Sequence, residues 1–270
     1  MRAIEINLFL NSLIGDLPEN TVDRVIYGDP DREVSGISVC WMPYIDTIKE
    51  AKRLGTNVMV VHEPTFYTHW DLQGKTNYSD AVSVKKKIID ENQITIIRCH
   101  DVWDIMPQVG IPFIWGRFLG LGEPFSIDKY LHVYKITPQK AIDFAKGIVK
   151  MTSFLGQDAI GFYGDPNRLV TKVGIGTGCI GAPLDFYKMG ADIAIVVDDI
   201  MRAWEAGEWC NDTGYPAVVV NHAVSEVPAM SSLADLLIKR FPELKIIHIP
   251  QNSSYLNILS TRSNGGDRDI

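Results

Sequence analysis

AVVVNHAVSE, residues 217–226, decides how this chain is expected to fold. Its four apolar, mostly β-branched residues predict a buried strand, which runs directly into Asn221 and His222, with Glu226 four residues after the histidine. In open α/β sheets, ligands bind in the crevice beyond the carboxyl ends of the strands. The stretch therefore predicts an α/β fold in which an imidazole and a carboxylate lie at a functional strand end.

Two further strands are predicted earlier in the chain. Short apolar runs at residues 57–61 and 93–97 lie on either side of a helical pattern at residues 81–91, whose run Lys85-Lys86-Lys87 is expected on the solvated side. A strand–helix–strand order implies parallel pairing with a right-handed crossover. We therefore expect both strands and the strand at 217–220 to end on the same edge of one sheet.

Ligand-type side chains follow all three predicted strands. They are His62, Glu63, His100, Asp104, His222 and Glu226. Pro64 indicates that the backbone leaves the sheet after the first strand, and the i, i+4 spacing of the two later pairs brings each pair together on a helical turn. Imidazoles with carboxylates suit zinc, iron, manganese, cobalt or nickel, and three or more carboxylates in one site favour two ions. The sequence therefore predicts a metal site.

Nearby features keep more than one interpretation. The segment Gly174 to Gly178 is either a tight turn between a strand and a helix or a nest of backbone N–H groups that could hold an anion. Asp198 and Asp199 either cap the following helix or lie near the metals. His69 is expected at the surface.

Composition narrows the classes of partner. The net charge of −7 and the pI of about 5.4 provide no general attraction to nucleic acid or anionic lipid. No apolar run approaches the roughly 18 residues of a membrane span, and residues 1–15 predict an amphipathic helix rather than a signal peptide. The four cysteines form no C-x-x-C pair, and Cys99 and Cys179 are expected to be small buried hydrophobes. We expect a cytoplasmic protein with a small-molecule substrate and no membrane or nucleic-acid partner.

The domain organisation follows from the middle of the chain. Residues 108–132 are rich in glycine, proline and aromatics and are expected to be irregular, and Thr137 with Pro138 predicts a helix start after a strand at 130–136. We expect residues 1–125 and 170–260 to form the main metal-binding α/β lobes. Residues 126–169 are expected to be a connecting or inserted α+β segment, and residues 261–270 a flexible tail.

The order of the motifs resembles the Nif-three-like family (Ngg-interacting factor three), whose members often carry the label GTP cyclohydrolase type-two homologue. That family has an early His-His-Pro, a middle His-x-x-x-Asp, a Gly-rich strand turn, a Gly-Asp strand end and a late His-x-x-x-Glu. The matching segments here are His62-Glu63-Pro64, His100 to Asp104, Gly174 to Gly178, Asp198-Asp199 and His222 to Glu226. The resemblance spans roughly residues 1–250.

This resemblance implies a two-lobed fold with mixed or parallel sheets flanked by helices and a small central α+β insertion. It also implies a dinuclear metal centre and a ring-like homo-oligomer, commonly a hexamer. The metal ligands that it implies are His62, Glu63, Asp104, His222 and Glu226.

The chain departs from the family pattern at two places. Glu63 stands where the family has its second histidine, and an anionic oxygen there favours harder ions such as manganese or magnesium. Asp198 replaces the glycine of the Gly-Asp strand end, and Ala203 stands where the family often has a further histidine.

The function expected from these features is a metal-dependent hydrolase acting on a small substrate that carries phosphate or a nucleotide. His100 or Glu63 would be its general acid or base. The alternatives are a non-catalytic metal-binding or regulatory oligomer and a nucleotide-binding module that uses the turn at Gly174 to Gly178.

Overall fold

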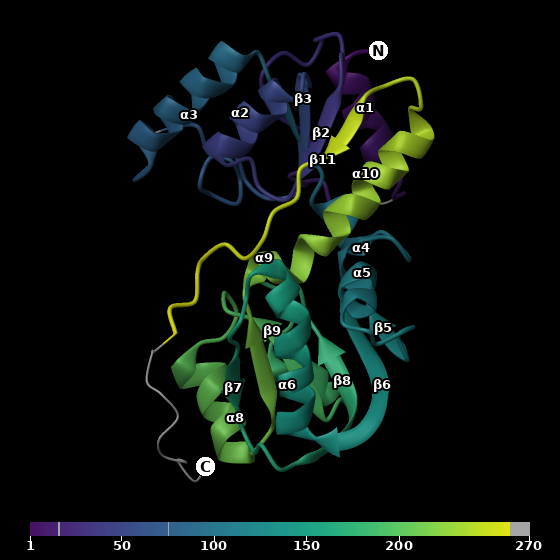
Figure 1. The fold of residues 1–270 in the computed structure, drawn as a ribbon, viewed down its shortest axis with the longest axis vertical. Helices are drawn as coiled ribbons and strands as arrows, with labels where there is room; N and C mark the ends of the chain where they lie inside the picture. The colour runs from purple at the N-terminus through teal and green to yellow at the C-terminus, as the bar shows by residue number, and fades with distance from the viewer. Residues whose placement is uncertain (16, 75, 260–270) are drawn as a thin grey trace.

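Two mixed β-sheets, one in each of two stacked lobes, organise the protein (Figure 1). The computed structural model describes residues 1–15, 17–74 and 76–259. The expected flexible tail at 261–270 lies outside the described residues. No helix within the described ranges is long and apolar enough to cross a membrane.

The sheet of the first lobe has five strands in the order β1-β4-β3-β2-β11. Its strands are β1 (Val25–Tyr27), β2 (Ile37–Cys40), β3 (Val58–Val61), β4 (Thr95–Arg98) and β11 (Ile246–His248). β11, β2, β3 and β4 pair in parallel, since the segments that connect them contain helices or, between β4 and β11, the whole second lobe. β1 pairs antiparallel with β4 at the edge of the sheet. Every residue of β2, β3 and β4 is buried, including the polar Ser38, Thr95 and Arg98, as expected for a mainly parallel sheet with helices on both faces.

Helices cover both faces of this sheet. One face packs against α1 (Ala3–Asn11) and α10 (Pro228–Arg240), and the other against α2 (Ile45–Arg53) and α3 (Ser79–Asn92). Alternate strand residues therefore belong to different cores, Val58 and Val60 to the first and Met59 and Val61 to the second.

The sheet of the second lobe has six strands in the order β5-β6-β8-β9-β10-β7. They are β5 (Ser126–Asp128), β6 (Leu131–Lys140), β7 (Gly161–Tyr163), β8 (Leu169–Ile175), β9 (Ile193–Val197) and β10 (Ala217–Val220). One face packs against α6 (Ala141–Thr152), and the other carries α7 (Pro183–Lys188), the π-helix η2 (Ala203–Gly207) and α8 (Glu208–Thr213). A 3-10 turn, η1 (Ser153–Leu155), follows α6.

Three short helices lie where the lobes meet. The chain leaves the first lobe through α4 (Asp101–Ile105) and α5 (Ile111–Phe118), and it returns from β10 through α9 (His222–Glu226) and α10. After β11, the yellow C-terminal segment in Figure 1 runs back past α9 towards the second lobe. The two-lobed α/β fold with mixed sheets is thereby confirmed.

The expectation that all three ligand-bearing strands share one sheet edge is wrong. β3 and β4 are parallel neighbours in the first sheet, but β10 lies in the second sheet between β9 and β7. A crossover pattern predicts parallel pairing only for strands that follow one another, and the other five strands of the second sheet lie between β4 and β10 along the chain. The strand ends nevertheless meet, because the two sheets point their carboxyl ends at the same boundary between the lobes.

Local predictions in the middle of the chain were also wrong. Residues 108–132 are not wholly irregular, since they contain α5 and β5. Thr137 and Pro138 do not begin a helix but lie within β6, where the pairing with β8 shifts register between Lys135 and Gln139. A proline is tolerated at such an irregularity because no ladder hydrogen bond needs its missing N–H.

Segment 126–169, expected to be a connecting or inserted α+β segment, contains α6 and contributes β5, β6 and β7 to the second sheet. Two predictions of burial also failed. Lys85 is buried although it was expected on the solvated side of α3, and Cys179 is exposed although Cys99 is buried as expected.

Candidate metal centre

The end of β3 delivers His62 and Glu63 to the boundary between the lobes. The backbone N–H groups of both residues donate to the carbonyl of Trp41, at 3.0 and 2.8 Å, so the chain turns out of the ladder there. The ring Nδ1 of His62 donates to the carbonyl of Cys99 at 3.2 Å. This bond leaves the Nε2 of His62 facing the carboxylates of the site.

The end of β4 leads directly into α4, which carries His100 and Asp104. The buried carboxylate of Asp23 accepts the first N–H groups of this helix, from His100 at 2.7 Å, Asp101 at 3.0 Å and Val102 at 2.8 Å. These N–H groups have no partner within a helix, so Asp23 holds α4 at its starting point.

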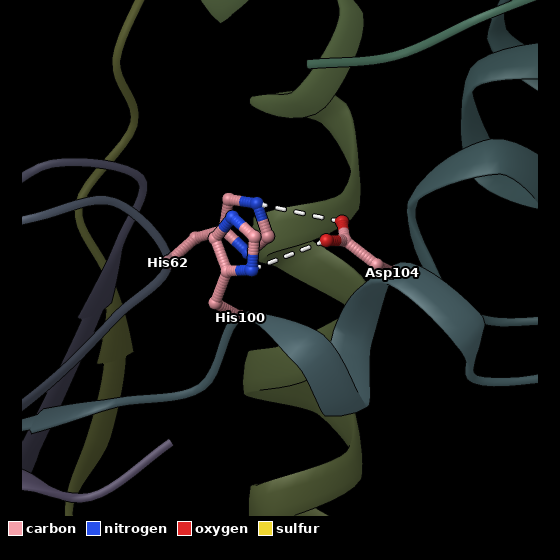
Figure 2. Close-up of side chains that lie close together, drawn as sticks. All are labelled: His62, His100 and Asp104. Carbon is pink, nitrogen blue, oxygen red and sulfur yellow. Dashed lines mark ion pairs between the residues drawn. The ribbon is translucent and has the colours of Figure 1, made fainter. Parts of the chain in front are cut away.

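Asp104 lies beside two stacked imidazoles and faces a nitrogen of each ring (Figure 2). Its oxygens are 3.6 Å from the Nε2 of His62 and 3.2 Å from the Nδ1 of His100, and the two rings stack with centroids 4.5 Å apart. The i, i+4 spacing of His100 and Asp104 thus acts as predicted.

The end of β10 leads into α9, which carries His222 and Glu226. Asp198, at the end of β9, accepts the N–H of His222 at 3.0 Å, and Asp199 accepts its ring Nδ1 at 2.7 Å. Asp198 therefore caps α9 rather than the helix that follows it in sequence, and Asp199 lies behind a site histidine.

Contacts across the lobe boundary join these elements into one group, called the site cluster below: His62, Glu63, His100, Asp104, His222 and Glu226. The Nε2 of His222 is 3.0 Å from Glu63 and 3.1 Å from Glu226, and Glu226 is 3.4 Å from the Nε2 of His62. The structure thus brings together all six side chains that were singled out in the sequence.

The donor set of the site cluster fits divalent metal ions. The Nε2 atoms of His62 and His222 are buried and have no hydrogen-bond partner among the described residues, although carboxylate oxygens lie close by. Each ring is oriented through its Nδ1 by an oxygen acceptor, as is usual for metal-binding histidines. Two groups within the cluster have donor atoms close enough to share an ion, His62–His100–Asp104 and His62–Glu63–Glu226.

Burial and the close packing of charged side chains shift the pKa values of residues in the site cluster. Burial disfavours the charged form of His62, but the carboxylates of Glu226 and Asp104 raise its pKa to about 9. Burial raises the pKa of Asp104 to about 6. Against its burial, the cationic neighbours His222 and His62 hold the pKa of Glu226 well below its usual range. Positive charge is therefore favoured within the site cluster.

A cavity of about 750 Å³ opens onto the site cluster. Glu63, His100, Asp104, His222 and Glu226 all line it, whereas His62 lies behind them. His69 is exposed, as expected, and its ring lies edge-on to His100 with centroids 5.5 Å apart. A small molecule can therefore reach most of the site cluster.

The Gly-rich turn lies against the same cavity. Gly178 has a φ of +55°, and a Cβ there would lie 2.8 Å from the Oε1 of Glu226. Close approach to the site cluster explains this glycine, and α7 begins only at Pro183, so the turn does not lead directly into a helix.

Sequence reasoning missed several residues that support the site. Trp41 donates its indole N–H to Glu226 at 2.7 Å, and the buried Arg98 lies 3.6 Å from Glu63. Asp23 was missed as well. Each of these residues is far in sequence from the group that it supports, so no spacing pattern could have identified it.

Comparisons with known proteins match both the sequence and the fold. The profile of a family described as Duf34/NIF3 (NGG1p interacting factor 3) matches residues 21–254. A protein of Clostridium perfringens (strain 13 / Type A), named GTP cyclohydrolase 1 type 2 homolog, is 22% identical over 229 residues, which cover 80% of this chain and 82% of that protein.

Solved structures have the same architecture. The crystal structure of a Bacillus cereus protein related to NIF3 aligns with a TM-score of 0.79 at 12% identity, covering 96% of this chain and 99% of that one. A hypothetical protein of Staphylococcus aureus aligns with a TM-score of 0.77 at 17% identity, also covering 96% of this chain and 99% of that one. At such identities the likeness shows the fold.

Proposed function

This chain belongs to the Duf34/NIF3 family, and from this premise we propose that the site cluster holds two divalent metal ions and serves the hydrolysis of a small substrate. The observation that carries the proposal is the pair of buried Nε2 atoms, on His62 and His222, that face carboxylates without a hydrogen-bond partner in the described chain. Such atoms cost free energy unless a ligand completes them.

The proposed ligands are His62, Glu63, Asp104, His222 and Glu226. Histidine nitrogens suit zinc, iron, cobalt and nickel, while the added oxygen of Glu63 favours manganese or magnesium. Divalent ions in such a site supply Lewis acidity to a substrate oxygen and to water.

His100 is proposed to move the proton. Its ring lines the cavity, and its Nδ1 lies 3.0 Å from Asp101 and 3.2 Å from Asp104, which orient the imidazole. Burial opposes the charged form of His100, but the charge of Asp104 raises its pKa, and this favours the protonated ring that would give a proton to a leaving group. Glu63 would take this role if it does not bind metal.

Metal content tests the site. Elemental analysis of the purified protein should find bound divalent metal, and His222→Ala should lose most of it. His248→Ala is the matched control, because His248 lies on β11, away from the cavity, and should leave the metal content unchanged. Glu63→His should keep the metal but shift its preference from manganese towards zinc. Full metal in His222→Ala would show that the site is elsewhere.

Catalysis needs a separate assay. The protein should be given phosphoesters, cyclic amides and GTP, the last because a relative carries the name GTP cyclohydrolase 1 type 2 homolog. Turnover that a chelator abolishes and added metal restores would support a hydrolase. Stoichiometric metal without turnover on any of these substrates would instead support the non-catalytic alternative, a metal-binding or regulatory protein.

The proposal includes a homo-oligomer, a hexamer by family resemblance. Large apolar side chains near the end of the described chain support an interface, since Leu256 and Ile258 are 84% and 90% exposed. Light scattering after size-exclusion chromatography tests the assembly, and a monomeric mass at micromolar concentration would contradict it.

A further inference from the structure

Lys85 is a buried cation that the proposed metal chemistry does not use. It lies on α3 and lines the same cavity as the site cluster, with only 3% of its surface exposed, while its neighbours Lys86 and Lys87 are more exposed. Among the described residues that line the cavity, it is the one basic side chain other than histidines. A lysine is seldom buried without a partner of opposite charge.

The ammonium group of Lys85 is only partly satisfied. Its Nζ donates to the carbonyl of Thr65 at 2.7 Å and lies 5.2 Å from the ring centroid of Tyr67. Asp71, whose charge favours the ammonium, is itself paired with Arg98 at 3.4 Å. An ammonium has three donors, and one neutral acceptor together with a ring face does not offset the burial of a full charge. An anion entering the cavity would complete it.

Tyrosine side chains line the same cavity. Tyr44, Tyr67, Tyr78 and Tyr255 line it and are between 40% and 51% exposed. The rings of Tyr67 and Tyr78 lie 5.7 Å apart at 37°. Exposed aromatic rings that gather at one cavity offer flat apolar surface to a planar ligand.

The loop that carries Tyr67 is held in place from inside. Tyr67 has a φ of +62°, which is unusual for a tyrosine, and the buried Asp71 accepts the N–H groups of Thr65 and Phe66 at 2.6 and 2.8 Å. These bonds hold the backbone at Thr65 and Phe66, and with it the carbonyl of Thr65 that accepts from Lys85.

We propose that Lys85, with Tyr67 and Tyr78, forms a subsite for ligands that join a planar ring to an anionic group. Lys85 contacts the anion, and the tyrosine rings contact the planar part. The inference deepens the proposed function, on which it rests in taking the cavity as the substrate site, because it specifies the class of substrate as an aryl or heteroaryl phosphate or carboxylate.

Calorimetric titration with small probes tests the subsite. Phenyl phosphate and benzoate carry a ring with an anion, phenol carries the ring alone, and inorganic phosphate the anion alone. The wild-type protein should bind phenyl phosphate or benzoate more tightly than phenol and inorganic phosphate, and the comparison of the first two distinguishes phosphate from carboxylate. Equal affinity for phenol and the aryl anions, or no binding of either aryl anion, would overturn the proposal.

Variants then identify the residues. Lys85→Met should weaken binding of the preferred aryl anion by about tenfold or more, the usual effect of losing a hydrogen bond to a charged group. Lys87→Met is the control on the exposed face of the same helix and should bind as the wild type does. Undiminished binding by Lys85→Met would refute the role of this lysine. Should Lys85→Met fail to fold, Tyr67→Leu provides a second test, and it should weaken phenyl phosphate binding while leaving inorganic phosphate unaffected.

Metal content separates this inference from the proposed function. Lys85→Met should retain the metal of the wild type, so lost probe binding with full metal supports the subsite. Probe binding that depends on Lys85 in a protein without metal would support the subsite while removing the proposed hydrolase. Full metal with probe binding that does not depend on Lys85 would refute the subsite and leave the proposed function standing.

Discussion

The indole N–H of Trp41 donates a 2.7 Å hydrogen bond to the Oε2 of Glu226. Trp41 follows β2 in the first lobe, and Glu226 ends α9 on the return from the second lobe, 185 positions later in the sequence. The same carboxylate oxygen lies 3.4 Å from His62 and 3.1 Å from His222. Trp41 therefore orients a carboxylate on which both halves of the site cluster converge.

Trp41→Phe tests this relationship. The variant keeps the ring but removes the donor, and loss of a partner that orients a ligand typically costs tenfold or more in metal affinity, so we expect a decrease of about tenfold. Trp103→Phe is the matched control, because Trp103 is also buried and its indole N–H donates to the carbonyl of Ala229 at 3.0 Å, away from the cavity. This variant loses a comparable hydrogen bond outside the site. Competition with a chelating dye measures both. Equal losses in the two variants would attribute the effect to packing.

Gly178→Ala should weaken both the fold and the site. The left-handed backbone at φ +55° costs about 1–2 kcal/mol for a non-glycine residue, and the new Cβ would push on Glu226. Gly190→Ala separates these effects, because Gly190 has a φ of +80° and open space around its Cβ position. Urea unfolding should show similar destabilisation in both variants, whereas metal affinity should fall only in Gly178→Ala.

Asp199→Asn should lower metal affinity through His222. The carboxylate accepts the Nδ1–H at 2.7 Å, and an amide in its place can present its NH₂ and favour the other tautomer. We expect a loss of about tenfold. Asp192→Asn is the comparison. Asp192 lies just before β9, away from the cavity, and its carboxylate accepts the backbone N–H groups of Thr171 and Lys172 on β8. This variant should reduce stability but leave metal affinity intact.

Anion binding at Lys85 should depend on pH. Burial lowers the pKa of Lys85 to about 8, so its ammonium is present below that pH and lost above it. The affinity for phenyl phosphate should therefore fall as the pH rises through about 8, as measured by titration between pH 6.5 and 9.5. Lys85→Arg should remove this dependence, since arginine stays charged throughout. An unchanged decline in Lys85→Arg would assign the pH effect to another group.

Local sequence patterns identified the strands that matter and the side chains at their ends. Apolar runs placed β3, β4 and β10 close to their observed bounds, and strand-end positions singled out all six members of the site cluster. The predictions from these patterns failed where one local pattern is compatible with two different structures. Pro138 lies at a register shift within a strand instead of beginning a helix, and Lys85 faces the interior instead of the solvent.

Periodicity, turn residues and motif order depend on interactions between residues close in the chain, and they sufficed for the α/β class, for the strand ends and for the resemblance to the family. The division of the strands between two sheets, the support of Glu226 by Trp41 and the burial of Lys85 depend on contacts between residues far apart in the chain. Such contacts form only when the lobes pack, because hydrogen bonding and burial act through space and leave no fixed spacing in the sequence.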